Sequence, residues 1–165
     1  MSHPANLPVD RLLAQCSVQR TRRGGPGGQH RNKVETAVTI THDPTDIRAE
    51  ASERRSQGAN LSQATRRLRV RLALRVRTPA SDMPSPLWAG RAAAGRIEVN
   101  PTHDDFPALL AELLDVLAAR GWKPAAAAEF LAVSASQLVK LLKLEPEAMG
   151  LLNDERRRLG LAPLQ

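Results

Sequence analysis

Aromatic side chains and cysteine are scarce in this sequence of 165 residues, which has two Trp, two Phe, no Tyr and one Cys. Proteins that read single-stranded RNA stack bases on aromatic side chains, so this composition argues against that class. The single cysteine, Cys16, permits no internal disulfide and indicates a reducing compartment. We expect Cys16 to be a small buried residue rather than a nucleophile.

Long apolar runs are also absent. No stretch reaches the roughly 18 apolar residues of a membrane-spanning helix, and residues 1–10 lack the features of a signal peptide. We therefore expect a cytoplasmic protein without a membrane partner. The histidines show no paired spacing with acidic residues or cysteine, so we expect no metal and no cofactor, and we expect His3, His42 and His103 to be surface residues.

Basic residues are distributed unevenly along the chain. Lys and Arg number 24 against 17 Asp and Glu, a net charge of +7. Residues 1–78 hold 15 basic and 6 acidic residues, a net +9, whereas residues 79–165 hold 9 and 11, a net −2. Cations gain affinity for polyanions by releasing condensed counterions. The first part of the chain is therefore expected to bind nucleic acid.

The first part has the pattern of a small mixed sheet followed by a helix. Residues 12–21 read as a strand, and residues 36–41 and 47–51 alternate as the two strands of a β-hairpin around a turn at 42–46. Residues 61–77 fit a helical stripe, with Asn60 or Ser62 as the expected cap. We expect an α+β domain over residues 1–78.

The rest of the chain has a helical pattern. Residues 79–100 are rich in Pro and Gly and read as a linker. Residues 101–165 read as a helical module: a helix capped by Asp104 or Asp105 and ended by Gly121, a second from Pro124 to about 131, a third after Ser134 to about 144, and a fourth over 146–158. The second and third helices resemble a helix-turn-helix, although a plain helical bundle fits equally well.

One glycine-rich, basic segment is the candidate for a catalytic or binding loop. Residues 20–33 contain five basic residues around the run Gly24-Gly25-Pro26-Gly27-Gly28, with Gln29 directly after it. Glycines let a backbone approach a ligand closely, and flanking cations can hold phosphates. The spacing does not fit the known nucleotide-phosphate loops, so nucleotide hydrolysis is not predicted. Composition alone leaves open a flexible basic loop without chemical meaning.

The residues from this loop onward combine several unrelated types in order: Gly27-Gly28-Gln29, then His30, Asn32, Lys33, Glu35, Thr36, Ala37 and Val38, then Ile40-Thr41-His42 and Pro44-Thr45, and later 53–57 with Asn60 and the Arg-rich segment 64–72. This series resembles the catalytic domain of class I peptide chain release factors over roughly residues 16–77. Gly58-Ala59 departs from the pattern, because relatives often carry a His-Lys pair there.

The resemblance implies hydrolysis of the peptidyl-tRNA ester in the peptidyl-transferase centre, with the large ribosomal subunit and peptidyl-tRNA as partners and a monomeric protein. It assigns the catalytic roles to Gly27, Gly28 and Gln29, of which Gln29 helps to place the attacking water. The residues assigned to ribosomal RNA are Arg20, Arg22, Arg23, His30, Arg31, Asn32, Lys33, Arg54 and Arg55, followed by Arg66, Arg67, Arg69 and Arg71.

Only 26 residues precede Gly27, so we expect no domain that reads a stop codon before it. The expectation is a codon-independent hydrolase of the ribosome-rescue kind, although the basic C-terminal tail of some such proteins is missing. Two alternatives stay open: a non-enzymatic nucleic-acid-binding protein that uses the helix-turn-helix-like module, and a hydrolase of free peptidyl-tRNA.

Overall fold

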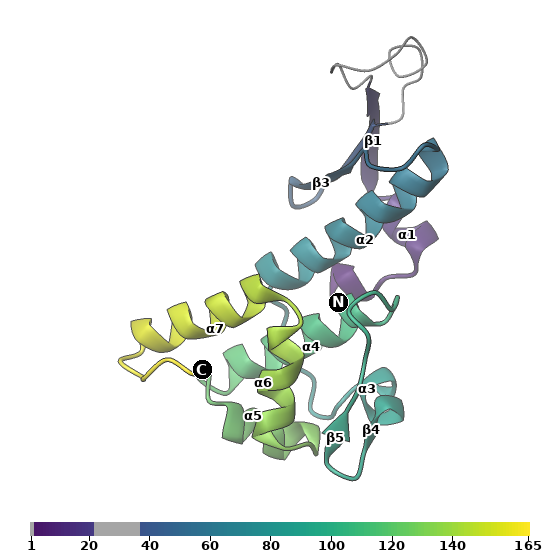
Figure 1. The fold of residues 1–165 in the computed structure, drawn as a ribbon. Coiled ribbons are helices and arrows are strands. Elements are labelled where there is room, and N and C mark those ends of the chain that lie inside the picture. Colours follow the sequence, from purple (N-terminus) through teal and green to yellow (C-terminus); the bar gives the residue numbers. More distant parts are fainter. Residues whose placement is uncertain (1, 22–36) are drawn as a thin grey trace. The chain divides into compact units, whose positions relative to one another are not determined.

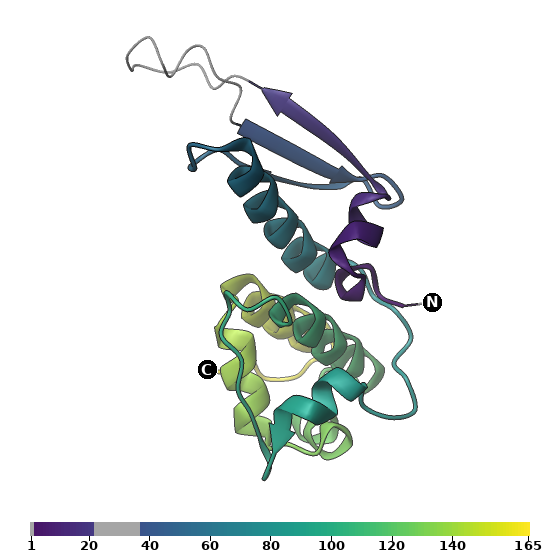
Figure 2. The same cartoon turned by 90° about the vertical axis from the view of Figure 1, so that its right-hand side faces the viewer.

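The computed structural model describes residues 2–21 and 37–165. Contacts between Cα atoms divide the chain into two compact units, Pro4–Leu72 and Ala73–Gln165, and the first residues of the chain join the latter. Figures 1 and 2 show that the former unit combines a sheet with helices, whereas the latter is mainly helical. The predicted α+β fold with a C-terminal helical region is confirmed.

The sheet of the Pro4–Leu72 unit has the strand order β1-β2-β3, with β1 at Cys16–Thr21, β2 at Ala37–His42 and β3 at Ile47–Ala51. The predicted hairpin of β2 and β3 is confirmed, and both described ladders are antiparallel rather than mixed. A 3₁₀ helix η1 (Pro4–Asn6) and a short helix α1 (Val9–Leu13) precede β1. The prediction of a strand from residue 12 was therefore wrong at its start, because Leu12 is fully buried as part of α1.

Helix α2 (Gln57–Arg75) lies along one face of this sheet (Figure 2). Alternate residues of β2 are buried, as the two-residue period of a strand requires, and residues of α2 spaced by four are buried with them. The core of the unit consists of Leu12, Val38, Ile40, Ala49, Ala51, Ala64, Leu68 and Leu72.

The start of α2 differs from the sequence prediction. The helix begins before Asn60, and Ser56 caps it: the Ser56 hydroxyl accepts a hydrogen bond from the Ala59 amide at 3.1 Å, and the Ser56 carbonyl accepts one from the Asn60 amide at 3.1 Å. Asn60 is inside the helix and fully buried. Its side chain therefore does not cap the helix.

The helical part of the Ala73–Gln165 unit matches the predicted helices closely. It contains α4 (Phe106–Ala119), α5 (Pro124–Leu131), α6 (Ala135–Lys143) and α7 (Pro146–Arg158). Ser134 caps α6 as predicted, with its side-chain oxygen accepting from the Gln137 amide. Asp105 precedes α4 but makes no side-chain cap; its carboxylate pairs with Arg91 instead. Most of α4 is buried, which places it at the centre of the helical core.

Residues 79–100, read as a linker from their Pro and Gly content, contain helix α3 (Pro86–Arg91) and the short paired strands β4 (Ala92–Ala93) and β5 (Arg96–Ile97). Trp88 anchors α3: it is fully buried, and its indole N–H donates to the Leu131 carbonyl at 3.0 Å. Pro86 occupies the first turn of α3, where a proline is tolerated, so its presence did not exclude a helix.

Candidate functional site

The predicted catalytic loop joins β1 to β2. The ladder between these strands runs from the pair Cys16–His42 to the pair Thr21–Ala37, so the two ends of the loop emerge from neighbouring strands. Residues 22–36 lie outside the described part of the chain. The roles assigned to Gly27, Gly28 and Gln29, and those assigned to Arg22, Arg23, His30, Arg31, Asn32 and Lys33, therefore stay predictions.

Three of the described residues that were predicted to bind RNA, Arg20, Arg54 and Arg55, belong to one end of the sheet. Arg20 on β1 is paired with Val38 on β2, and Val38 is paired with Ala51 at the end of β3. Arg54 and Arg55 follow Ala51 in the segment that joins β3 to α2, and this segment lies near the end of β1 in both views (Figures 1 and 2). All three arginines are exposed, and none of their guanidinium groups has a polar partner among the described residues. This end of the sheet is therefore cationic and accessible.

The segment between β3 and α2 is held by side chains of α2. Asn60 accepts a hydrogen bond from the Arg54 amide at 2.9 Å and donates one to the Arg54 carbonyl at 3.0 Å. Arg67 donates to the Glu50 carbonyl at 2.7 Å and to the Glu53 carboxylate at 2.5 Å. Hydrogen bonds from backbone amides, chiefly that of Ser52, hold the pKa of Glu53 below its usual value, and Arg67 adds to the effect. The segment thus has a defined backbone course.

Some arginines on α2 are hydrogen-bonded within their own unit, whereas others could bind a ligand. Arg69 is buried and donates to the Ala5 carbonyl at 3.1 Å, and Arg71 donates to the Arg48 carbonyl. With Arg67, three of the four helix arginines expected at RNA are thus hydrogen-bonded to the backbone of their own unit. Arg66 is half-buried, and no partner for it occurs among the described residues.

Two histidines expected at the surface are buried instead. His42 is 2% exposed and lies between Thr45 and Gln15, and His3 is 7% exposed and bonds the Val76 carbonyl at 3.1 Å. Burial lowers the pKa of both. Strand alternation could have signalled His42, because it continues the buried series of Val38 and Ile40.

Cys16 is half-buried, and its thiol donates to the Leu12 carbonyl at 3.1 Å. Burial raises its pKa to about 11, which keeps the thiol protonated and unreactive at neutral pH. Across residues 2–21 and 37–165, no group of three or more His, Cys, Asp or Glu is placed to hold a metal ion. The helices of the same residues include none that is long and apolar enough to cross a membrane.

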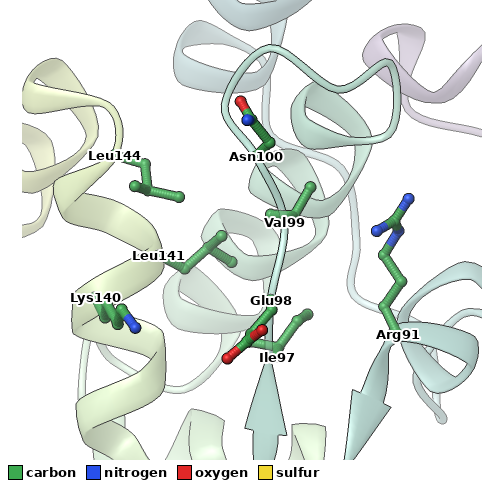
Figure 3. Close-up of a pocket in the computed structure, with 8 residues that line it drawn as sticks. All are labelled: Arg91, Ile97, Glu98, Val99, Asn100, Lys140, Leu141 and Leu144. Carbon is green, nitrogen blue, oxygen red and sulfur yellow. The ribbon is translucent and has the colours of Figure 1, made fainter.

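The helical unit contains a pocket of about 440 Å³ between α6 and the extended residues that follow β5 (Figure 3). Lys140 and Leu141 on α6 line it together with Leu144, the C-cap of α6, and Glu98 and Val99 line it from the extended segment. Arg91 also borders the pocket, but its charge is balanced by Asp105 at 2.6 Å. The lining residues include no hydroxyl, thiol or imidazole, so this pocket offers no Ser-His or Cys-His pair.

The helix-turn-helix-like pair has the predicted break. Ala132 adopts a left-handed conformation after α5, and Ser134 caps α6 two residues later. Ser136, Lys140 and Lys143 are exposed on α6, whereas Gln137 is half-buried. A nucleic-acid-reading role for this pair stays a prediction.

Comparison with known proteins shows what the sheet unit is similar to. Residues 12–85 match the RF-1 domain family. The chain is 56% identical over 55 residues to the chloroplastic peptide chain release factor PrfB1 of Arabidopsis thaliana, 51% identical over 67 residues to peptide chain release factor 1 of Caldicellulosiruptor saccharolyticus, and 45% identical over 94 residues to peptide chain release factor 1 of Acidiphilium cryptum. These matches span 33%, 41% and 57% of this chain, but only 12%, 19% and 25% of the respective relatives.

The matched segment begins at Leu12 and contains all three strands of the sheet and the whole of α2. It also contains the loop with Gly27-Gly28-Gln29 and the cationic sheet end that carries Arg20, Arg54 and Arg55. Residues 12–85 of this chain are therefore an RF-1 domain and belong to the family of class I release factor catalytic domains.

Proposed function

We propose that this protein hydrolyses the ester bond of peptidyl-tRNA on the ribosome, and that it does so without reading a stop codon. The observation that carries the proposal is the RF-1 domain over residues 12–85, in which Gly27-Gly28-Gln29 lies between two paired strands. The relatives with which it shares this segment are named peptide chain release factors.

The residues of the predicted loop fit the hydrolysis of an ester. Water adds to the ester carbonyl, the bond to the tRNA 3′ oxygen breaks, and the products are the free peptide acid and a tRNA hydroxyl. A bond at the bottom of an RNA cavity requires a narrow probe, and glycines at 27 and 28 remove the side chains that would collide with RNA. In this proposal the amide of Gln29 places the water and its backbone N–H stabilises the developing oxyanion.

The cationic sheet end supplies the affinity. Arg20, Arg54 and Arg55 are exposed at the end of the sheet where β1 ends and β2 begins, and in this proposal they bind RNA phosphates. Codon independence is the finer part of the proposal. It is tested separately, by comparing peptide release with different codons in the A site.

The test is release of labelled peptide from purified ribosomes that carry peptidyl-tRNA in the P site. Three complexes are compared, with a stop codon, a sense codon or no codon in the A site. We expect similar release from all three, and a decrease of roughly 100-fold or more for Gln29→Ala, since the loss of transition-state positioning and electrostatic stabilisation costs at least this much in other enzymes.

Gln19→Ala is the matched control, because Gln19 is an exposed glutamine on β1 in the same unit. It should release peptide at the wild-type rate. Full activity of Gln29→Ala would exclude the assigned catalytic role. Release only on the stop codon would exclude codon independence and leave ester hydrolysis intact.

A further inference from the structure

The side chain of Asn60 on α2 makes two hydrogen bonds to the backbone of Arg54, which precedes α2. We call this pair of bonds the Asn60 clamp. Its side-chain oxygen accepts from the Arg54 amide at 2.9 Å, and its side-chain nitrogen donates to the Arg54 carbonyl at 3.0 Å. Both backbone groups of Arg54 are thereby satisfied by one side chain. Asn60 itself is 0% exposed, so it has no surface with which to touch a ligand.

Other hydrogen bonds also hold the segment between β3 and α2. Arg67 holds the beginning of the segment through the Glu50 carbonyl and the Glu53 carboxylate. Ser56 ends the segment as the cap of α2. Asn60 acts between these two points, and it is the residue that fixes the middle of the segment through Arg54.

Two arginine side chains of this segment take no part in holding it. The side chains of Arg54 and Arg55 are exposed and have no polar partner among residues 2–21 and 37–165. The backbone of Arg54 is fixed by two hydrogen bonds, while the guanidinium groups of Arg54 and Arg55 stay available. This combination is that of a preorganised anion site, in which the ordering cost of the backbone is met on folding rather than on binding.

We propose that Asn60 is a positioning residue for the contact of Arg54 and Arg55 with the phosphates of ribosomal RNA. The inference rests on the proposed function, because RNA is the polyanion that this function supplies. In this proposal Asn60 acts through the backbone of Arg54 and not by touching RNA. Its replacement therefore weakens the binding of the ribosome and leaves the chemical step at Gln29 unchanged.

The experiment compares the wild-type chain of 165 residues with Asn60→Ala in peptide release at increasing ribosome concentration. We expect the half-saturating concentration to rise about tenfold, the effect of one strong charged hydrogen bond, with the rate at saturation within about twofold of wild type. The salt dependence should also become shallower, by up to about 0.9 in the slope of log affinity against log salt for each phosphate that the variant no longer neutralises.

Asn153→Ala is the matched control, since Asn153 makes the same kind of clamp in the helical unit. Its side chain donates to the Leu164 carbonyl at 2.9 Å and accepts from the Leu164 amide at 2.7 Å. Removing this clamp should change neither the half-saturating concentration nor the salt dependence.

A double-mutant cycle separates positioning from general stability. Replacing both Arg54 and Arg55 with Ala should weaken ribosome binding in the wild type, but add little when Asn60 is already Ala. Additive effects would overturn the proposal, and so would a lower rate at saturation with an unchanged half-saturating concentration.

Hydrogen exchange of the Arg54 amide in the wild-type protein provides a measurement that depends on no variant. We expect the amide to be protected, and fast exchange would exclude the clamp even if Asn60→Ala did not fold. Co-sedimentation with large subunits gives binding without release. A wild type that binds but does not release peptide would refute the proposed function, while the effect of Asn60→Ala on binding would still decide this inference.

Discussion

Four described residues other than glycine adopt a left-handed backbone: Asp46, Ala94, Trp122 and Ala132. Ala132 is the most informative of them, because it ends α5 with φ of 54° and allows Ser134 to start α6. Its side chain is exposed, so no packing depends on its methyl group. A left-handed conformation costs an L-residue about 1–2 kcal/mol, whereas glycine adopts it freely.

We predict that Ala132→Gly raises the free energy of unfolding by about 0.5–1 kcal/mol, the strain relieved less the extra entropy of glycine in the unfolded chain. Urea denaturation followed by circular dichroism gives the value. Ala125→Gly should act in the opposite direction, by about 1 kcal/mol, because Ala125 is an exposed residue inside α5. If both substitutions were destabilising, the break between α5 and α6 would not depend on backbone strain at Ala132.

At the scale of elements, α4 fixes the chain that follows α2. The carboxylate of Asp115 on α4 accepts from the Thr78 amide at 3.1 Å and the Thr78 hydroxyl at 2.5 Å, and it pairs with Arg77 at 3.2 Å. Three residues earlier, Glu112 binds both the amide and the hydroxyl of Ser85, which caps α3. Two carboxylates on one helix thus order residues 77–85.

We predict that Asp115→Ala lowers the free energy of unfolding by about 3 kcal/mol. Asp115 is 6% exposed, so its removal leaves the Thr78 amide and hydroxyl without their acceptor and the half-buried Arg77 without its carboxylate partner. Asp154→Ala provides the comparison, because Asp154 forms an exposed pair with Arg157 on α7 and should contribute less than about 0.5 kcal/mol. Urea midpoints measure both, and equal effects would contradict the special role of Asp115.

The helices and strands that could be predicted from sequence are those with a hydrophobic pattern or a capping residue within their own residues. The leucine spacing of α4, the alternation of β2 and β3, and Pro124 and Ser134 at the helix starts are local patterns. Helix α3 escaped prediction because its burial depends on Trp88, whose partner Leu131 lies 43 residues away. In the candidate site, exposure could be expected for Arg54 and Arg55, but not the clamp by Asn60, because Asn60 also resembles a helix cap.

At the scale of the whole molecule, the described residues of each unit include one buried histidine. His42 belongs to the Pro4–Leu72 unit, and His3 belongs to the other unit. The amide oxygen of Gln15 can only accept, so Nε2 of His42 donates to it, while Nδ1 lies 2.7 Å from the Thr45 hydroxyl, which can donate to it when the ring is neutral. Burial lowers the pKa of both histidines, and the opposing effects of Asp43 on His42 and of Asp115 on His3 are smaller.

We predict that both units lose stability as the pH falls below about 6.5, the pKa of histidine in the unfolded chain. A folded-state pKa below this value means that the unfolded chain binds more protons, so the stabilisation is complete above pH 6.5 and decreases until the pH passes the folded-state pKa. Each histidine contributes at most about 1.4 kcal/mol per pH unit in that window. Urea midpoints at pH 7.5 and 5.5 should therefore differ more for the wild type than for His42→Gln or His3→Gln, and least for the double variant, since the two residues titrate in separate units. An unchanged difference in the double variant would show that carboxylates, not these histidines, cause the loss of stability in acid.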